Sequence, residues 1–279
     1  MLMKITIIQQ DIVWGNPAAN CMTAARLMAT TPASDIYVLP EMFSTGFGHR
    51  PQSIGNGKDE TLGWMRAQAR ETDAAICGSV AVADGGQYFN RFYFVEPDGK
   101  VTAYDKRHLF TYGGEDKVFS PGSDRPILSF RGFRILPEIC YDLRFPVWAR
   151  NGGDGTDGNY HIIIYVASWP RVRQQAWDTL LRARAIENQC YVVGVNRVGR
   201  DPHNDYAGGS AIIGPQGETL AECEERVMEA ATAEVSMSSL AAVRRAFPVL
   251  RDRDAFTMLA SSSAVENTLK NDETSNNMT

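Results

Sequence analysis

Cysteine is scarce in this sequence, and its distribution offers no cross-linking pattern. Among 279 residues there are five cysteines, an odd number without a CxxC pair: Cys21, Cys77, Cys140, Cys190 and Cys223. This spacing argues against a disulfide framework and against a structural zinc site. The four histidines form neither an HExxH motif nor another ligand spacing, so we expect no catalytic metal and no cofactor.

Long apolar runs and a strong charge imbalance are also missing. No stretch approaches the roughly 20 apolar residues that span a bilayer, and the first residues turn polar too soon for a signal peptide. The formal net charge of -5 argues against a nucleic-acid or anionic-membrane partner. No glycine-rich phosphate loop follows a predicted strand, so nucleotide binding has no support. We therefore expect a cytoplasmic protein whose partner is a small molecule.

The remaining composition is that of a globular protein. Hydrophobic residues make up 44% and charged residues 22% of the chain, which is enough to bury a substantial core. Neither a repeat nor a linker interrupts the pattern, so residues 1–260 are predicted to form a single domain. Residues 261–279 are rich in Ser, Asn, Thr and charge, and we predict that they form a flexible tail.

Short apolar or β-branched runs, several of them ended by Gly, Pro or Asp, predict strands. They are Ile5–Gln9, Ile36–Leu39, Ala75–Val82, Phe92–Val95, Arg134–Cys140, His161–Ala167, Tyr191–Arg197, Gly209–Ile213 and Ala230–Val235. The connections Val95–Val101 and Ile213–Glu218 contain Pro-x-Gly turns and predict hairpins.

Helical periodicity lies between some of these runs, at Pro17–Ala29, Glu60–Glu71 and Arg173–Cys190. Asn16 precedes the first helix and is predicted to be its N-cap. Because strands alternate with helices in some places and form hairpins in others, we expect an α/β fold with two layered sheets and helices outside.

Three residues with reactive side chains stand at predicted strand ends, where catalytic groups usually lie in α/β proteins. Glu41 follows an apolar run and Pro40, Lys106 lies in a charged turn, and Cys140 ends the run that begins at Arg134. Taken singly, each has an ordinary explanation. They can be a surface glutamate, a solvated basic turn and a small buried hydrophobe.

Together, the same three residues make a complete set for acyl transfer. A cysteine nucleophile needs a base, because a free thiol is mostly protonated at neutral pH. A partly buried carboxylate can be that base, and an ammonium can stabilise the oxyanion of a tetrahedral intermediate. Glu41, Lys106 and Cys140 are therefore our candidate catalytic residues.

Six short motifs link the chain to a known family. They are Leu39-Pro-Glu-Met-Phe-Ser-Thr-Gly-Phe47, Tyr104-Asp-Lys-Arg-His-Leu-Phe110, Ile139-Cys-Tyr-Asp-Leu-Arg-Phe-Pro146, Ala167-Ser-Trp-Pro170, Arg182-Ala-Arg-Ala-Ile-Glu-Asn188 and Asn196-Arg-Val198. With these motifs the chain resembles the nitrilase superfamily of carbon–nitrogen hydrolases, and within it the omega-amidase branch, up to about Phe256. The resemblance implies a four-layer α-β-β-α sandwich that pairs as a homodimer through helices near the nucleophile.

The resemblance also implies roles for particular residues. Glu41 would be the general base, Lys106 the oxyanion residue and Cys140 the nucleophile that forms a thioester. Members of the family carry a second glutamate between the lysine and the cysteine. Glu115 matches that place, and Asp116 is its near rival.

The omega-amidase resemblance implies small linear amides that also carry a carboxylate, such as 2-oxoglutaramate or 2-oxosuccinamate, cleaved to an acid and ammonia. Arginine is the usual clamp for a carboxylate, and the candidates are Arg171, Arg173 and Arg144. Arg144 is equally placed to pair with Asp142. The other expected pocket residues are Trp169, Phe110, Tyr112 and Tyr141, the last through its backbone N–H as a second oxyanion donor.

Two other functions fit the sequence. One is another enzyme of the same superfamily, namely a nitrilase, a carbamoylase or an aliphatic amidase. The other is a binding protein that uses this fold without catalysis. Glu138 is an oddity, because it lies two residues before Cys140 on a predicted strand, where both side chains would share a face. We expect it either to form a local salt bridge or to raise the pKa of the thiol.

Overall fold

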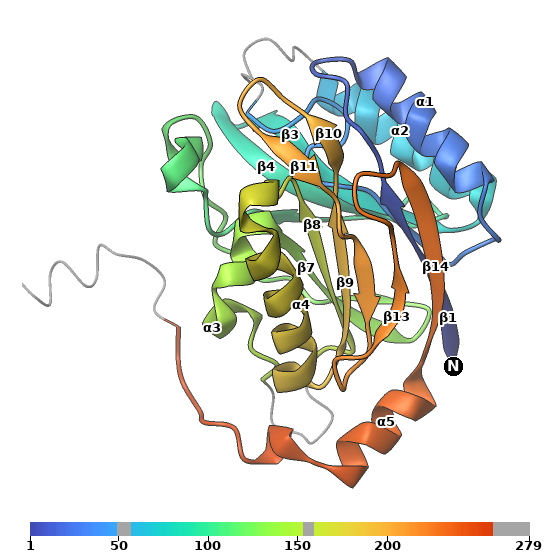
Figure 1. The fold of residues 1–279 in the computed structure, drawn as a ribbon, viewed down its shortest axis with the longest axis vertical. Coiled ribbons are helices and arrows are strands. Elements are labelled where there is room, and N and C mark those ends of the chain that lie inside the picture. Colours follow the sequence, from blue (N-terminus) through green and yellow to red (C-terminus); the bar gives the residue numbers. More distant parts are fainter. Residues whose placement is uncertain (49–56, 153–158, 259–279) are drawn as a thin grey trace, which may run out of the picture.

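The first sheet has six strands in the order β14-β1-β2-β3-β4-β5 (Figure 1). The computed structural model describes residues 1–48, 57–152 and 159–258. The central pairs β1–β2 and β2–β3 are parallel, and β14, β4 and β5 add antiparallel pairs at the two edges. The bounds are β1 Leu2–Gln9, β2 Ile36–Val38, β3 Ala75–Asp84, β4 Gln87–Val95, β5 Val101–Asp105 and β14 Glu229–Ser236.

The second sheet repeats this plan in the order β13-β12-β9-β8-β7-β6. Its central pairs β7–β8 and β8–β9 are parallel, and its outer pairs are antiparallel. The bounds are β6 Leu128–Phe130, β7 Phe133–Ile139, β8 Ile162–Ala167, β9 Tyr191–Asn196, β12 Ala211–Ile213 and β13 Thr219–Glu222. A separate hairpin joins β10 (Val198–Arg200) to β11 (Asp205–Ala207).

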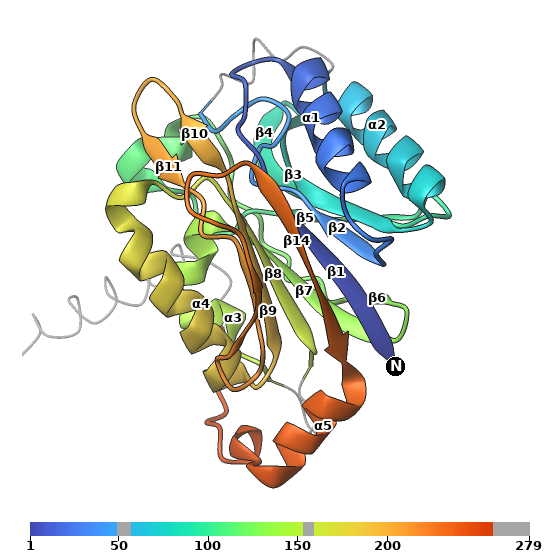
Figure 2. The same ribbon diagram turned by 45° about the vertical axis from the view of Figure 1, so that its right-hand side comes forward.

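Helices cover the outer face of each sheet (Figures 1 and 2). α1 (Pro17–Ala29) and α2 (Gly57–Thr72) lie on the first sheet, while α3 (Pro146–Ala149) and α4 (Gln174–Asn188) lie on the second. α5 (Met237–Ala246) follows β14 at the far end of the molecule. The predicted α-β-β-α sandwich is confirmed.

Strands of the first sheet are apolar on both faces, because one face meets the second sheet and the other meets helices. Ile36 and Val38 belong to the core between the sheets. Tyr37 and Leu39 belong to the core beneath α1 and α2. This explains why the strand reads as a continuous apolar run rather than as an alternating one.

The predicted strands and helices are found, with shifts at their ends. The helix predicted over 17–29 has those bounds, and the Asn16 side chain accepts a hydrogen bond from the Ala19 N–H at 3.1 Å. Both predicted hairpins form, as β4–β5 and β12–β13. The sequence did not predict β6, β10, β11, α3 or α5. The predicted tail at 261–279 lies outside the described residues.

None of the helices that the structure describes has the length and hydrophobicity required to cross a membrane.

Candidate active site

The carboxyl ends of four strands, two from each sheet, carry the polar residues of the candidate site. β2 and β5 run in the same direction within the first sheet, and β7 and β8 are parallel within the second. Glu41 follows β2, Lys106 follows β5, Cys140 follows β7 and Ser168 follows β8. The stacking of the two sheets therefore brings together residues that are far apart in sequence.

Cys140 begins a turn of 3-10 helix, η4 (Cys140–Arg144), directly after β7. Its φ is 46°, in the left-handed region, where a residue with a side chain is strained. The Ile139 N–H donates to Asp142 Oδ2 at 3.0 Å, which fixes the start of the turn. Cys140 is 9% exposed, and the Glu41 carboxylate lies near enough to raise the pKa of its thiol.

The carboxylate of Glu41 is fully buried and receives hydrogen bonds from three elements. Its Oε1 accepts from Lys106 Nζ at 2.9 Å and from Asn90 Nδ2 at 2.8 Å. Its Oε2 accepts from the Ser168 N–H at 2.8 Å. These bonds hold the carboxylate in one orientation beside Cys140.

Lys106 is buried between two carboxylates. Its Nζ lies 2.9 Å from Glu41 Oε1 and 2.9 Å from Glu115 Oε2, and 5.3 Å from the centre of the Phe47 ring. Glu115 lies in a short 3-10 helix, η3 (Glu115–Lys117), and its Oε2 accepts the Phe110 N–H at 2.6 Å. Its neighbour Asp116 is exposed, so the geometry selects Glu115 of the two acids.

Burial and charge shift the pKa values of these groups. Burial, and then the Glu41 carboxylate, hold the pKa of the Cys140 thiol well above its ordinary value, against the opposing effect of Lys106. Burial would lower the pKa of Lys106, but Glu115 and Glu41 raise it above its ordinary value. Burial raises the pKa of Glu115, and Lys106 opposes that rise. At neutral pH the site therefore holds Cys140 as a thiol and Lys106 as an ammonium.

Asn90, in the middle of β4, was not predicted as a site residue. Its Nδ2 donates to Glu41 Oε1 at 2.8 Å and to Glu115 Oε1 at 3.1 Å. The signal available in the sequence was a lone amide between Phe89 and Phe92 in a strand that is otherwise largely aromatic. A buried amide must have hydrogen-bond partners, and here those partners are the two acids.

A cavity opens on Cys140, and predicted pocket residues line it. They are Tyr141, Trp169, Phe110, Arg144 and Arg173. The remaining lining residues, which were not predicted, are Phe47, Ser168, Pro170, Asn204 and Tyr206. Asn204 and Tyr206 come from the β10–β11 hairpin, whose short strands leave little pattern in the sequence.

Two predicted pocket residues lie outside this lining. Arg171 is half-exposed, and its Nε lies 3.0 Å from Asp205 Oδ2. Tyr112 is 86% exposed and packs on the outer side of Phe110, with ring centres 5.8 Å apart. Within the described residues Arg144 does not pair with Asp142. Its guanidinium lies 4.8 Å from the centre of the Trp169 ring.

Glu138 is fully buried, and among the described residues neither of its carboxylate oxygens has a hydrogen-bond partner. Burial, and then Asp142, raise its pKa well above the ordinary value, while Arg125 and Arg184 oppose the rise. The expected local salt bridge does not form within the described residues. The charged neighbours of Cys140 are a different set, because the chain turns out of the strand at that residue.

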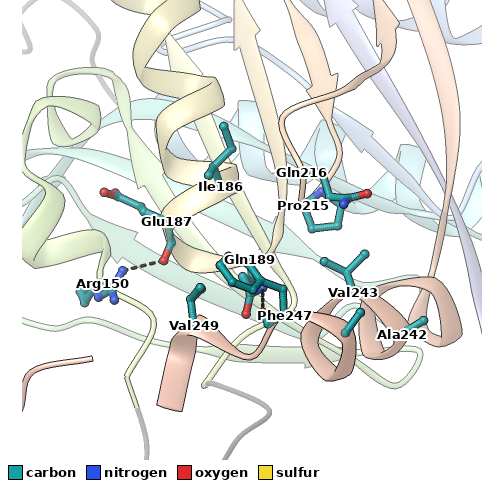
Figure 3. A pocket seen from close by; sticks show the side chains of 11 residues that line it. Arg150, Ile186, Glu187, Gln189, Pro215, Gln216, Ala242, Val243, Phe247 and Val249 are labelled. Carbon is teal, nitrogen blue, oxygen red and sulfur yellow. Dashed lines mark hydrogen bonds between the residues drawn. The ribbon is translucent and has the colours of Figure 1, made fainter. Parts of the chain in front are cut away.

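A second and larger cavity, of about 770 Å³, lies where the end of α4 meets α5 (Figure 3). Figure 3 shows Ile186, Val243 and Phe247 around it, and the Gln189 side chain donates to the Phe247 carbonyl oxygen at 2.6 Å. Its described lining contains no Cys, Ser, Thr, Lys or His. It therefore has no nucleophile for acyl transfer. Nor do the described parts of the chain contain a group of three or more His, Cys, Asp or Glu arranged to hold a metal ion.

The fold and this cysteine site together define a class. A family model described as carbon-nitrogen hydrolase matches residues 4–245. The chain belongs to the carbon-nitrogen hydrolase family, and the resemblance predicted from its motifs is confirmed.

Particular relatives sharpen this assignment. The chain is 44% identical to the omega-amidase YafV of Escherichia coli, over 92% of this chain and 98% of that protein. It is 34% identical to a 2-oxoglutaramate amidase of Bacillus subtilis, over 90% of this chain and 98% of that protein. Among solved structures, XC1258 of Xanthomonas campestris, a CN-hydrolase superfamily protein with an arsenic adduct in its active site, has a TM-score of 0.87 and 38% identity. That match covers 93% of this chain and all of that one.

Proposed function

We propose that this protein is an omega-amidase, which hydrolyses the terminal amide of small omega-amido carboxylic acids of the 2-oxoglutaramate or 2-oxosuccinamate type. The observation that carries the proposal is a thiol that lines a cavity and has as its charged neighbours the Glu41 carboxylate and the Lys106 ammonium, which lie 2.9 Å apart. The names of two relatives that span nearly the whole chain support the substrate class.

In the first half of the reaction Cys140 is the nucleophile and Glu41 its base. Because the thiol is protonated at rest, its proton passes to Glu41 as sulfur attacks the amide carbon. The oxyanion that forms is stabilised by Lys106 and by the backbone N–H of Tyr141. Glu41 then protonates the amide nitrogen and the C–N bond breaks. Ammonia departs, and the acyl group remains bound to Cys140 as a thioester.

In the second half a water molecule loses a proton to Glu41 and attacks the thioester carbon. The C–S bond breaks, the acid leaves, and the proton on Glu41 returns to sulfur. Glu115 holds the Lys106 ammonium charged and correctly oriented throughout. The ammonium has three N–H donors, and its contact with Glu115 Oε1 is the longest of the three at 3.2 Å, so that donor is the one that turns to the oxyanion.

The substrate carboxylate binds to Arg173 and Arg144, both of which line the cavity. Each guanidinium is stacked on an aromatic ring, Arg173 at 5.3 Å from the centre of Phe110 and Arg144 at 4.8 Å from that of Trp169. Such stacking restricts an arginine while leaving its planar N–H donors available for a carboxylate. Arg171 is a weaker candidate, because Asp205 already occupies its guanidinium.

The protein acts in the cytoplasm as a homodimer. The larger cavity of Figure 3 supports the dimer, because two apolar side chains that line it are exposed. Ile186 is 52% exposed and Phe247 is 70% exposed. Arg150 and the end of α4, which also line the cavity, belong to segments next to the nucleophile turn. Exposed apolar surface of this kind is typical of a protein–protein interface. Molar mass by light scattering, for the native chain and Phe247→Glu, tests this assembly.

A panel of amides tests the substrate class. Ammonia release should be fastest with omega-amides that carry a carboxylate, with and without a 2-oxo group. A nitrile, an N-carbamoyl amino acid and an unsubstituted aliphatic amide represent the rival enzymes of the superfamily. Faster turnover of any of these three would contradict the proposal.

A thiol-alkylation assay separates the enzyme from a non-catalytic binding protein. Iodoacetamide should modify Cys140 faster than the other cysteines, and substrate should slow that reaction. If Cys140 is inert and no amide releases ammonia, the binding protein is the better description.

A further inference from the structure

Asn90 contacts both acids beside Cys140 through its side chain and the backbone of Lys106 through its main chain. Its backbone carbonyl oxygen accepts the Lys106 N–H at 2.9 Å. Its side-chain nitrogen donates to Glu41 Oε1 and to Glu115 Oε1, at 2.8 and 3.1 Å. We propose that Asn90 is a positioning residue that keeps the two carboxylates side by side, so that Glu41 can act as the base. This inference rests on the proposed function.

Two like-charged oxygens face each other in this arrangement. Glu41 Oε1 and Glu115 Oε1 each accept from Lys106 Nζ, at 2.9 and 3.2 Å, and each accept from the Asn90 amide. Lys106 supplies one positive charge to two buried carboxylates, so without Asn90 the cluster would carry an excess negative charge and too few hydrogen-bond donors. Buried carboxylates without enough donors take up protons instead, and a protonated Glu41 cannot accept the proton of the thiol.

The orientation of the amide supports this role. Asn90 is fully buried, and its Oδ1 has no hydrogen-bond partner among the described residues, while Nδ2 has two. Leaving a buried acceptor unpaired is unfavourable. The amide nevertheless turns its donors towards the acids, because the opposite orientation would set its oxygen against two carboxylates. Electrostatic attraction to the two acids therefore determines the orientation of the Asn90 amide.

An uncharged donor suits this position better than a second cation. An amide provides two N–H groups, one for each carboxylate, and adds no charge. A second cation would stabilise the ionised form of Glu41 more strongly and make it a weaker base. Asn90 thus stabilises both acids as anions and leaves Glu41 basic enough to take a proton.

The test compares Asn90→Ala, Asn90→Ser and Asn90→Asp with the native enzyme. In Asn90→Ala we expect kcat to fall by about 10- to 100-fold with little change in KM, because the loss lies in proton transfer. The acid limb of the pH profile should move up by about one unit, since a hydrogen bond to the anionic form is lost. Asn90→Ser keeps a single donor and should move the limb less, and Asn90→Asp should move it furthest.

A matched control separates positioning from general destabilisation. Asn188 is also fully buried, and its amide donates to the Arg184 carbonyl oxygen at 3.0 Å on α4. Asn188→Ala should lower the melting temperature and leave the pH profile unchanged. An acid limb that stays in place in a folded Asn90→Ala variant overturns the inference. If that variant does not fold, an unshifted limb in both Asn90→Ser and Asn90→Asp overturns it.

Alkylation of Cys140 by iodoacetamide gives a readout that needs no substrate. The Cys140→Ser variant gives the background rate of alkylation. In the Asn90 variants, the acid limb of the pH profile of Cys140 alkylation should shift in the same direction as that of turnover. If the native protein releases no ammonia from any amide, the proposed function fails, yet alkylation still tests Asn90. If ammonia is released and neither limb shifts, only the inference about Asn90 fails.

Discussion

Asp142 Oδ1 accepts two hydrogen bonds from His108, one from its backbone N–H at 2.9 Å and one from its ring Nδ1 at 2.8 Å. The other oxygen of the same carboxylate accepts from the Ile139 N–H and from the Tyr104 hydroxyl. One buried acid therefore ties the turn that carries the nucleophile to the loop that carries the lysine.

Replacing this acid should loosen both segments. In Asp142→Ala, buried donors lose their acceptor, and we expect a loss of about 3 kcal/mol in the free energy of unfolding. Urea denaturation measures this loss. Asp142→Asn keeps one oxygen and should cost less. Equal stability of Asp142→Ala and the native protein would contradict the coupling of the two segments.

Removal of the nucleophile should abolish turnover without unfolding the protein. Cys140→Ser and Cys140→Ala should release no ammonia, form no thioester adduct in mass spectrometry and keep their circular dichroism spectrum. Cys223→Ser is the matched control, because Cys223 is also buried but belongs to the segment after β13. Ammonia release at the native rate in a Cys140 variant would disprove the mechanism.

Glu115 should matter to catalysis, and its neighbour should not. Glu115→Gln removes one of the two carboxylates beside Lys106, so we expect kcat to fall by about 100-fold or more, within the range for acid–base groups. Asp116→Asn changes the next side chain, which is exposed, and should leave kcat unchanged. Steady-state kinetics of the pair checks this, and similar values in both variants would argue against a role for Glu115.

The resting nucleophile should be a thiol rather than a thiolate. Because burial and Glu41 raise the pKa of Cys140 well above its ordinary value of 9.0, the difference in absorbance at 240 nm between the native enzyme and Cys140→Ser should be negligible at pH 7. It should appear only in strongly alkaline solution. Glu41→Gln removes an anionic neighbour, so it should lower the pKa of the thiol and bring that absorbance to a lower pH. A thiolate signal at neutral pH would indicate an ion-pair mechanism instead.

Arginine variants should distinguish the residues that bind the substrate carboxylate. Arg173→Met and Arg144→Met should raise KM for omega-amido acids by about 10-fold or more, as expected when a charge-assisted hydrogen bond is lost. Their KM for amides without a carboxylate should change little. Arg171→Met is the control, because this side chain pairs with Asp205 and lies outside the cavity lining. A selective effect in Arg171→Met alone would reverse the assignment.

Local patterns in the sequence predicted most of the fold and selected the three candidate residues that the structure brings together. The helix over 17–29 carries its own N-cap and needs no distant contact to define its ends. Glu41, Lys106 and Cys140 were recognisable because each follows a run of strand-forming residues. Their meeting depends on the stacking of two sheets, which the motifs of the family indicated and local propensity alone does not specify.

The walls of the cavity were harder to predict, because contacts between distant segments define them. Arg171 and Arg173 are two residues apart in one short turn, η5 (Arg171–Arg173), and look equivalent in sequence. They differ because Asp205 pairs with the first, while Phe110 and the cavity adjoin the second. Asn90 was missed for the same reason, since its partners are two acids at sequence distances of 49 and 25 residues.

The strand ends that carry Glu41 and Cys140 share a backbone distortion with consequences for protein engineering. Met42, directly after Glu41, has a φ of 45°, and Cys140 has a φ of 46°. Left-handed residues of this kind reduce stability by about 1–3 kcal/mol each, so an inert version of this sandwich with relaxed turns would be the more heat-resistant protein. Efforts to raise the melting temperature should therefore leave positions 40–42 and 139–141 unchanged. Substitutions on the exposed faces of α1 and α2, which carry none of the acyl-transfer groups, offer a way to gain thermostability without losing turnover.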